Sequence, residues 1–168
     1  SNPTVPALVI APTRELAVQS QEELFKFGRD KGVKVRSVYG GSSIDKQIKA
    51  LRSGAHIVVG TPGRLLDLIK RKALRLDGVE TLILDEADEM LNMGFLDDIE
   101  AIIERVPVSR QTLLFSATMP EPIKRIGVKF MKEPEHVKIA AKELTNVNVE
   151  QYFVRVKEHE KFDTMTRL

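Results

Sequence analysis

The 168-residue chain contains no cysteine, so it can form no disulfide, which is usual for proteins of reducing compartments. It has no apolar run long enough to cross a bilayer and no basic-then-apolar N-terminal segment of the secretory kind. These absences exclude a disulfide scaffold and argue against a membrane partner. The sequence therefore predicts a cytoplasmic protein.

A phosphate loop of the form GxxxxGK[ST] is absent as well, because none of the 10 glycines is followed by a lysine. In one large class of NTPases that loop cradles the phosphates of the nucleotide. A nucleotide site of that class would therefore be incomplete within these residues.

The composition, with 42% hydrophobic and 30% charged residues, is that of a globular domain of ordinary size that can bury a core. The net charge of +2 hides an asymmetry, since residues 1–84 hold 14 Lys and Arg against 8 Asp and Glu, whereas residues 85–168 hold 12 against 16. This split favours a polyanionic partner near the first half, although solvated surface charge gives similar splits by chance.

Short aliphatic runs alternate with helical patterns, such as the stripe of Ala17, Ser20, Leu24 and Phe27. Continuous apolar strands separated by helices form a mostly parallel sheet covered on both faces, so the pattern predicts a doubly wound α/β fold. Binding sites in such sheets lie at the carboxyl ends of the strands. The expected strands are residues 7–11, 35–39, 56–60, 81–85, 112–116 and 136–140.

The pattern changes after Ala140, where a polar stretch precedes the alternating VEQYFVRV of residues 149–156. We interpret residues 141–168 as a linker followed by the start of another unit.

Three of the expected strand-to-helix turns offer open helix N-termini, where backbone N–H groups and the helix dipole favour an anion. Small residues leave these N–H groups accessible, and two arginines add guanidinium donors. For any single turn, ordinary capping is an equal explanation: Thr61 as N-cap before Pro62, or Ser42 with Asp45 as a capping box. Together the turns favour one extended polyanion; their candidate residues are Pro12, Thr13, Arg14, Gly40, Gly41, Thr61, Gly63 and Arg64.

A fourth turn ends the buried run LILDEADEML with Asp85, Glu86 and Asp88. Clustered carboxylates at a strand end are costly unless a cation or a reaction uses them. P-loop NTPases end a strand in this way to hold Mg²⁺ and to orient the attacking water. The alternative is an acidic helix N-terminus that complements the dipole.

A fifth turn places Ser116 and Thr118 after the buried run TLLF. Their hydroxyl groups are available to a site at the same edge of the sheet. The alternative is that Thr118 and Glu121 form a capping box for the next helix.

Taken in order, PTRELA (12–17), GG (40–41), TPGR (61–64), DEAD (85–88) and SAT (116–118) resemble the motif set of the DEAD-box RNA helicases. Each tetrapeptide is a weak signal alone, but the five in this order are specific. The resemblance covers essentially the whole chain and is closest in style to the bacterial cold-shock helicases.

The resemblance implies a role for each matching residue. Asp85 would contact Mg²⁺ through water, Glu86 would position the hydrolytic water, and Asp88 would hydrogen-bond toward Ser116 and Thr118. The residues of the three open turns would grip the RNA sugar-phosphate backbone, which gives binding independent of sequence.

It also implies a RecA-like fold, a doubly wound mostly parallel sheet with helices on both faces, here lacking the phosphate-loop strand. In the family that loop lies upstream of PTRELA. Residues 1–140 are thus expected to be a truncated first RecA-like domain, and residues 141–168 a linker and the start of a second. ATP and Mg²⁺ would serve the parent protein, with none bound to the fragment, which would be inactive alone.

Two alternatives remain open at this point. The chain could be a non-catalytic module for RNA or another polyanion, or an unrelated metal-dependent hydrolase built on Asp85, Glu86 and Asp88. The missing strand carries a further prediction. It would leave one edge of residues 112–116 unpaired and separate this strand from residues 136–140. Either the gap closes by rearrangement, or a segment of a second copy fills it, with VEQYFVRV as the favoured donor; of the two, self-association is the expectation.

Overall fold

The computed structural model describes residues 4–140 and 150–155. Its sheet contains seven strands in the order β2-β3-β1-β4-β5-β7-β6, and the first five of these run parallel. This confirms the predicted α/β class. The strands are β1 (Ala7–Ile10), β2 (Val35–Val38), β3 (Ile57–Gly60), β4 (Thr81–Leu84), β5 (Gln111–Ser116), β6 (Glu135–Ala140) and β7 (Glu150–Arg155).

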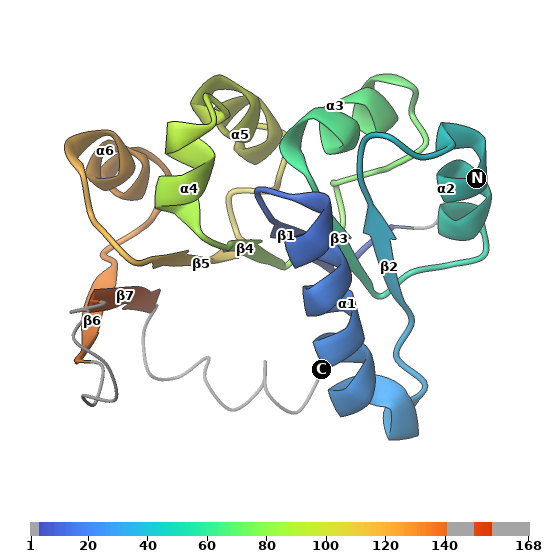
Figure 1. Ribbon diagram of the computed structural model, residues 1–168, viewed down its shortest axis with the longest axis horizontal. Coiled ribbons are helices and arrows are strands. Elements are labelled where there is room, and N and C mark those ends of the chain that lie inside the picture. The colour runs from blue at the N-terminus through green and yellow to red at the C-terminus, as the bar shows by residue number, and fades with distance from the viewer. Residues whose placement is uncertain (1–3, 141–149, 156–168) are drawn as a thin grey trace.

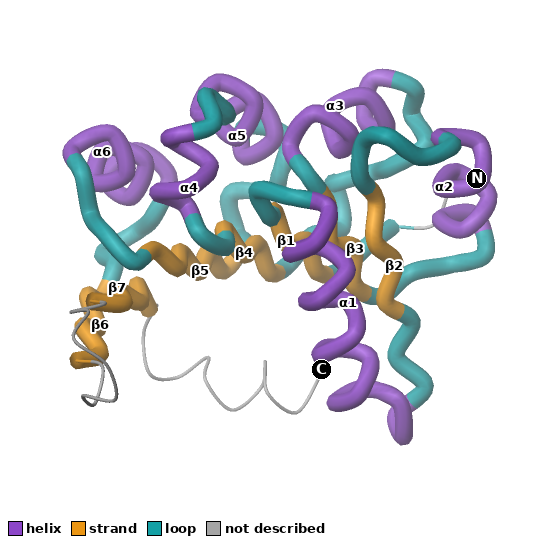
Figure 2. Tube along the Cα trace, viewed as in Figure 1, coloured by secondary structure: helices purple, strands orange, loops and turns teal. Residues whose placement is uncertain are grey.

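Helices lie on both faces of the sheet, but unequally: α1 covers one face, and the other helices cover the opposite face (Figures 1 and 2). The predicted alternation of strands and helices is confirmed, and the predicted stripe from Ala17 to Phe27 lies within α1. The helices are α1 (Arg14–Gly28), η1 (Arg29–Lys31), α2 (Ile44–Arg52), α3 (Pro62–Lys70), α4 (Ala87–Asn92), α5 (Leu96–Ile103) and α6 (Glu121–Phe130).

Two apolar clusters follow from this division. The larger one packs Leu8, Ile10 and Leu114 of the sheet against α3, α5 and α6, whereas the smaller one packs alternate residues of β1, β2 and β3 against Ala17 and its neighbours on α1. The predicted helical stripe of α1 includes Phe27, but the Phe27 side chain is 86% exposed. The stripe fails to predict burial there because the C-terminal end of α1 projects beyond the strands (Figure 1).

Strand β7 lies between β5 and β6, in the gap that the sequence analysis predicted beside β5. β7 pairs antiparallel with β5, with Phe115 opposite Phe153, and it pairs antiparallel with β6 on its other side. The predicted separation of β5 from β6 is therefore confirmed. The chain pairs β5 with its own residues 150–155 rather than with those of a second copy, and self-association stays a prediction.

The proposed boundary after Ala140 also stays a prediction, although β7 belongs to the same sheet as the preceding strands. Within residues 4–140 and 150–155, no helix has the length and apolarity to cross a membrane.

Candidate functional site

The five turns singled out in the sequence lie at one edge of the sheet, because β1 to β5 are parallel and each turn follows a carboxyl end. Backbone hydrogen bonds at the carboxyl ends of the strands join neighbouring turns and keep them aligned with one another. The N–H of Asp85 donates to the Ile10 carbonyl (2.9 Å), and the N–H of Thr61 donates to the Val38 carbonyl (3.1 Å). The strand order puts the three open turns on one half of this edge and the acidic turn on the other.

The first open turn begins α1. Thr13 is its N-cap, and the Thr13 hydroxyl accepts a hydrogen bond from the N–H of Leu16 at 3.3 Å. The Arg14 guanidinium lies over the ring of Tyr39, 4.8 Å from its centroid. Since Tyr39 directly precedes Gly40, this cation–π contact holds Arg14 beside the second open turn.

Arg64 connects the third open turn to the second. Its Nη1 donates to the Ser42 carbonyl (3.1 Å) and to Oε1 of Gln47 (2.9 Å), and Nε2 of Gln47 donates to the Tyr39 carbonyl (3.0 Å). Gln47 is buried although it is polar. Tyr39 and Gln47 thus position the predicted arginines, and neither was identified from the sequence, where each reads as an ordinary strand end or helix residue.

The glycines of these turns leave their backbone open. A Cβ added at Gly40, Gly41 or Gly63 would meet no atom within 4 Å, and Gly41 has a φ of 75°, a left-handed conformation that suits glycine. An elongated ligand can therefore approach the main chain closely at all three positions.

The capping alternatives were only partly right. Thr61 is indeed the N-cap of α3 with Pro62 next to it, but its side chain makes no capping hydrogen bond. The cap of α2 is Ser43 rather than Ser42, and the Ser43 hydroxyl accepts from the N–H of Lys46 at 3.4 Å. The predicted pair of Ser42 with Asp45 was wrong by one residue.

The acidic turn contains two carboxyl groups in an unfavourable environment. Burial raises the pKa of Asp85, partly opposed by the N–H of Glu86. Burial also raises the pKa of Glu86, and the neighbouring charges of Asp85, Asp88 and Glu89 add to the shift. Glu86 has a φ of 49°, a left-handed conformation that is costly for a residue with a side chain. Strain and raised acid pKa values together are typical of functional sites.

Asp88 is held differently from its two neighbours. Its Oδ2 accepts hydrogen bonds from the N–H (3.0 Å) and the hydroxyl (2.9 Å) of Thr118, and its own N–H donates to Oγ of Ser116 at 3.1 Å. Burial alone would raise the pKa of Asp88, but the hydrogen bonds of Thr118, Ser116 and Glu89 outweigh burial and lower it.

These contacts tie the turn after β4 to the turn after β5, which the family resemblance implied. They also replace the predicted capping box of Thr118 with Glu121, because the N-cap of α6 is Pro120.

A divalent cation would fit this edge in one way. Among the described residues no three His, Asp or Glu side chains gather to hold a metal directly, and Asp88 is engaged by Thr118. That arrangement disfavours a metal hydrolase with three carboxylate ligands. Asp85 is the best candidate, since its carboxylate is partly buried and makes no ion pair with the described cations. Mg²⁺ that keeps its waters and binds phosphates needs only one or two carboxylates.

A family model described as DEAD/DEAH box helicase matches residues 1–126. The chain belongs to this family. It is 85% identical over 165 residues to the DEAD-box ATP-dependent RNA helicase CshA of Streptococcus pneumoniae serotype 4, which covers 98% of the chain and 32% of that relative. It is 60% identical over 167 residues to CshA of Bacillus subtilis, covering 99% of the chain and 34% of the relative. The chain thus spans about a third of the length of these relatives.

Solved structures of DEAD-box proteins agree with the fold. A DEAD box protein from the hyperthermophile Methanococcus jannaschii superposes with a TM-score of 0.75 at 48% identity, over 79% of this chain and 36% of that one. The yeast splicing factor Prp28 gives a TM-score of 0.73 at 39% identity, over 76% and 31%. The RecA-like α/β fold predicted from the sequence is confirmed.

Proposed function

We propose that this chain provides one part of an ATP-dependent RNA helicase: the edge that grips the RNA backbone and the carboxylates that serve ATP hydrolysis. The observation that carries the proposal is the meeting of both sets of residues at one sheet edge, where the Asp88–Thr118 link joins the turns after β4 and β5. The relatives at 85% and 60% identity, both named as ATP-dependent RNA helicases, support it.

In this proposal the RNA lies across the open turns. Backbone N–H groups near Thr13, Gly41 and Gly63 face its phosphates, and Arg14 and Arg64 supply charge. Nη1 of Arg64 already donates hydrogen bonds to Ser42 and Gln47. Arg64 would therefore act partly by fixing the second and third open turns relative to each other. Contacts of this kind position a strand without reading its bases, so binding is independent of RNA sequence.

The carboxylates act on the other half of the edge. When bound with ATP, Mg²⁺ would neutralise charge on the phosphates. Asp85 would hold the waters of the ion, and Glu86 would orient the attacking water. A raised pKa makes Glu86 a stronger base once it is ionised. Through its hydrogen bonds to Ser116 and Thr118, Asp88 would couple a change in the conformation of the acidic turn to the turn after β5, which leads into α6.

RNA binding is tested by fluorescence anisotropy with a labelled single-stranded oligonucleotide. We expect weak binding that decreases with salt, because phosphate contacts dominate. Arg14→Ala should weaken binding equally for oligonucleotides of different sequence. The matched control is Arg125→Ala, an exposed arginine on α6, which should leave binding unchanged. An Arg14→Ala effect that depends strongly on base sequence, or an equal effect of Arg125→Ala, would contradict the proposal.

Hydrolysis is tested in two settings. The 168-residue chain should hydrolyse ATP no faster than buffer, since these residues contain no phosphate loop. RNA-stimulated hydrolysis that Glu86→Gln abolishes in this chain would refute that expectation. In a longer protein that combines the chain with a phosphate loop, Glu86→Gln should slow hydrolysis and leave nucleotide binding largely intact. Equal loss of both would assign Glu86 a structural role.

A non-catalytic RNA-binding module is the second candidate, favoured by the open backbone at Gly40, Gly41 and Gly63, which can hold a polyanion without any hydrolysis. It predicts the same RNA binding but no hydrolysis in any longer protein that carries this chain.

A further inference from the structure

An open cavity of about 430 Å³ lies at the opposite edge of the sheet from the proposed RNA and ATP site. Its lining comes from the segment between α5 and β5 and from the end of α6, so it borders the amino end of β5. This volume falls within the range of sites that accept small ligands or a few side chains. Nothing in the proposed helicase function uses it.

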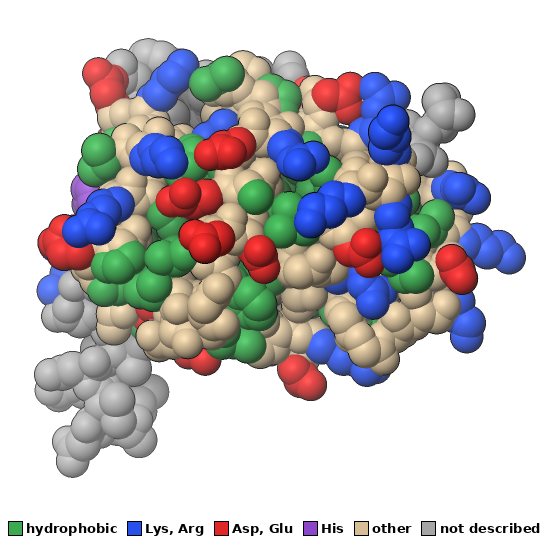
Figure 3. All heavy atoms as spheres, turned by 90° about the horizontal axis from the view of Figure 1, so that it is seen from above, with side chains coloured by type: hydrophobic (Ala, Val, Ile, Leu, Met, Phe, Trp, Pro, Cys, Tyr) green, Lys and Arg blue, Asp and Glu red, His purple; other side chains and the backbone are tan. Residues whose placement is uncertain are grey.

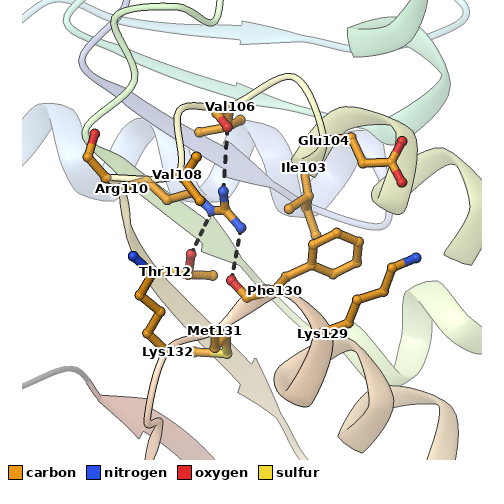
Figure 4. A pocket seen from close by; sticks show the side chains of 11 residues that line it. Ile103, Glu104, Val106, Val108, Arg110, Thr112, Lys129, Phe130, Met131 and Lys132 are labelled. Atoms are coloured by element: carbon orange, nitrogen blue, oxygen red, sulfur yellow. Dashed lines mark hydrogen bonds between the residues drawn. The ribbon is translucent and has the colours of Figure 1, made fainter.

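Arg110 occupies the middle of the cavity (Figure 4). Its Nε donates to the Thr112 hydroxyl (3.0 Å), Nη1 donates to the carbonyls of Val106 (3.4 Å) and Pro107 (3.3 Å), and Nη2 donates to the Phe130 carbonyl (2.9 Å). A guanidinium has five N–H groups, so one on Nη2 has no acceptor among the described residues. The Arg110 guanidinium is therefore held in position by these hydrogen bonds, while one N–H on Nη2 can still donate to a ligand.

The charge of this guanidinium has no counter-ion among residues 4–140 and 150–155. All of its partners in the described structure are carbonyl or hydroxyl oxygens, and burial lowers the pKa of Arg110 with no opposing carboxylate. A half-buried cation without an anionic partner is unfavourable, and a ligand carboxylate would compensate it.

The rim adds further positive charge. Lys132 is exposed and makes no hydrogen bond or ion pair within the described part of the chain. Lys129 lies 3.5 Å from the Glu100 carboxylate and 5.0 Å from the centroid of the Phe130 ring. Glu104 is the one carboxylate among the lining residues, and it is exposed. The cavity as a whole therefore attracts an anion.

Part of the wall is apolar. Ile103, Val106 and Met131 line the cavity but are buried, so the accessible apolar surface comes from half-buried Phe130 and from Val108 at the rim, which is 76% exposed. A bare phosphate or an RNA backbone has no apolar surface to place against such walls. A peptide that carries an apolar side chain beside a carboxylate matches both features.

We propose that this cavity binds a short acidic peptide segment of a partner protein, with one apolar side chain seated against Phe130 and Val108 and an adjacent carboxylate on Arg110. Since the cavity lies at the amino ends of the strands, the peptide can be bound while the carboxyl edge holds RNA. The partner would therefore attach to the helicase without competing with its RNA.

The probe for the test is a fluorescein-labelled peptide Asp-Asp-Leu-Phe-Asp-Asp, titrated with the 168-residue chain in an anisotropy assay. Two matched peptides separate the two features: Asn-Asn-Leu-Phe-Asn-Asn removes the charge, and Asp-Asp-Ala-Ala-Asp-Asp removes the large apolar side chains. We expect measurable binding of the first peptide only, with amide chemical-shift changes in ¹⁵N spectra confined to residues 103–112 and 129–132.

Exposed residues serve as variants, so that folding is preserved. Lys132→Glu should raise the dissociation constant about fivefold, because it reverses a rim charge, and the neutral substitution Val108→Asn should weaken binding through lost apolar contact. The matched control is Lys70→Glu, which makes the same charge change on α3 and should have no effect. Circular dichroism verifies that each variant is folded.

Several outcomes would overturn the proposal. These are shift changes at the carboxyl edge, equal weakening by Lys70→Glu, or equal binding of the Asn peptide. Displacement of the acidic peptide by inorganic phosphate at matched ionic strength would indicate a small-anion site instead, and displacement by single-stranded RNA would indicate a nucleic-acid site.

Discussion

Removing the Thr118 hydroxyl tests whether the turns after β4 and β5 are energetically linked. Thr118→Val deletes the 2.9 Å hydrogen bond to Oδ2 of Asp88 and leaves the backbone bond at 3.0 Å in place. A hydrogen bond to a charged group contributes roughly 1.5–3 kcal/mol. Thr118 is exposed, so water replaces part of the lost interaction. We therefore expect a loss of about 1 kcal/mol in the free energy of unfolding at neutral pH.

The pH dependence of this loss has a definite sign. The folded-state pKa of Asp88 is lowered, so its stabilising contribution is present above the unfolded pKa of about 4 and is lost as the pH falls through the folded value. The difference between wild type and Thr118→Val should therefore be full at pH 7 and should shrink below about pH 4.

The assay is urea unfolding followed by circular dichroism, with Thr118→Val, Asp88→Ala and the double variant forming a cycle. With a slope of about 2 kcal/mol per molar urea, the expected midpoint shift of Thr118→Val is roughly 0.5 M. The coupling energy of the cycle should be about 1 kcal/mol. Thr61→Val is the matched control, because the Thr61 side chain makes no capping hydrogen bond. A coupling energy near zero, or a loss that persists unchanged at low pH, would refute the reasoning.

Three further predictions concern the acidic turn, the open turns and the edge of β5. Asp85→Asn and Glu86→Gln should each raise the free energy of unfolding at pH 7, because burial raises the pKa of both acids and their ionised forms destabilise the fold. The gain should vanish below about pH 4, where both acids are protonated, and a gain that does not depend on pH would contradict this. In thermal unfolding, Gly60→Ala should lower the free energy of unfolding by roughly 1–3 kcal/mol, since its Cβ would lie 2.6 Å from the Leu65 side chain. Gly63→Ala, whose Cβ would meet nothing within 4 Å, should be neutral or stabilising by up to about 1 kcal/mol. Equal effects of the two substitutions would show that the packing account is wrong. Self-association remains expected, because exchange of residues 150–155 between two chains would preserve the β5 pairing seen within one chain; a sharp monomer in light scattering at micromolar concentration, with slow amide exchange across residues 112–116, would count against it.

The sequence alone determined most of the fold. The expected strands lie within one residue of the observed ones at each end, because buried parallel strands are continuous apolar runs that turn residues interrupt. The parallel direction of the strands then follows from the alternation of strand and helix. Parallel strands place their strand-to-helix turns at one edge of the sheet. Candidate residues such as Asp85 and Arg14 could therefore be found without coordinates.

Only the tertiary structure decided how those residues are used. Asp88 meets Thr118 across 30 positions of sequence, and Arg64 meets Gln47 across 17. The uncompensated Arg110, the pairing of β7 with β5 and the exposure of Phe27 likewise depend on which elements become neighbours. Local periodicity records only whether a residue faces the core or the solvent. The partners of a polar side chain are fixed when the strands and helices pack together, and no pattern within one segment encodes that packing.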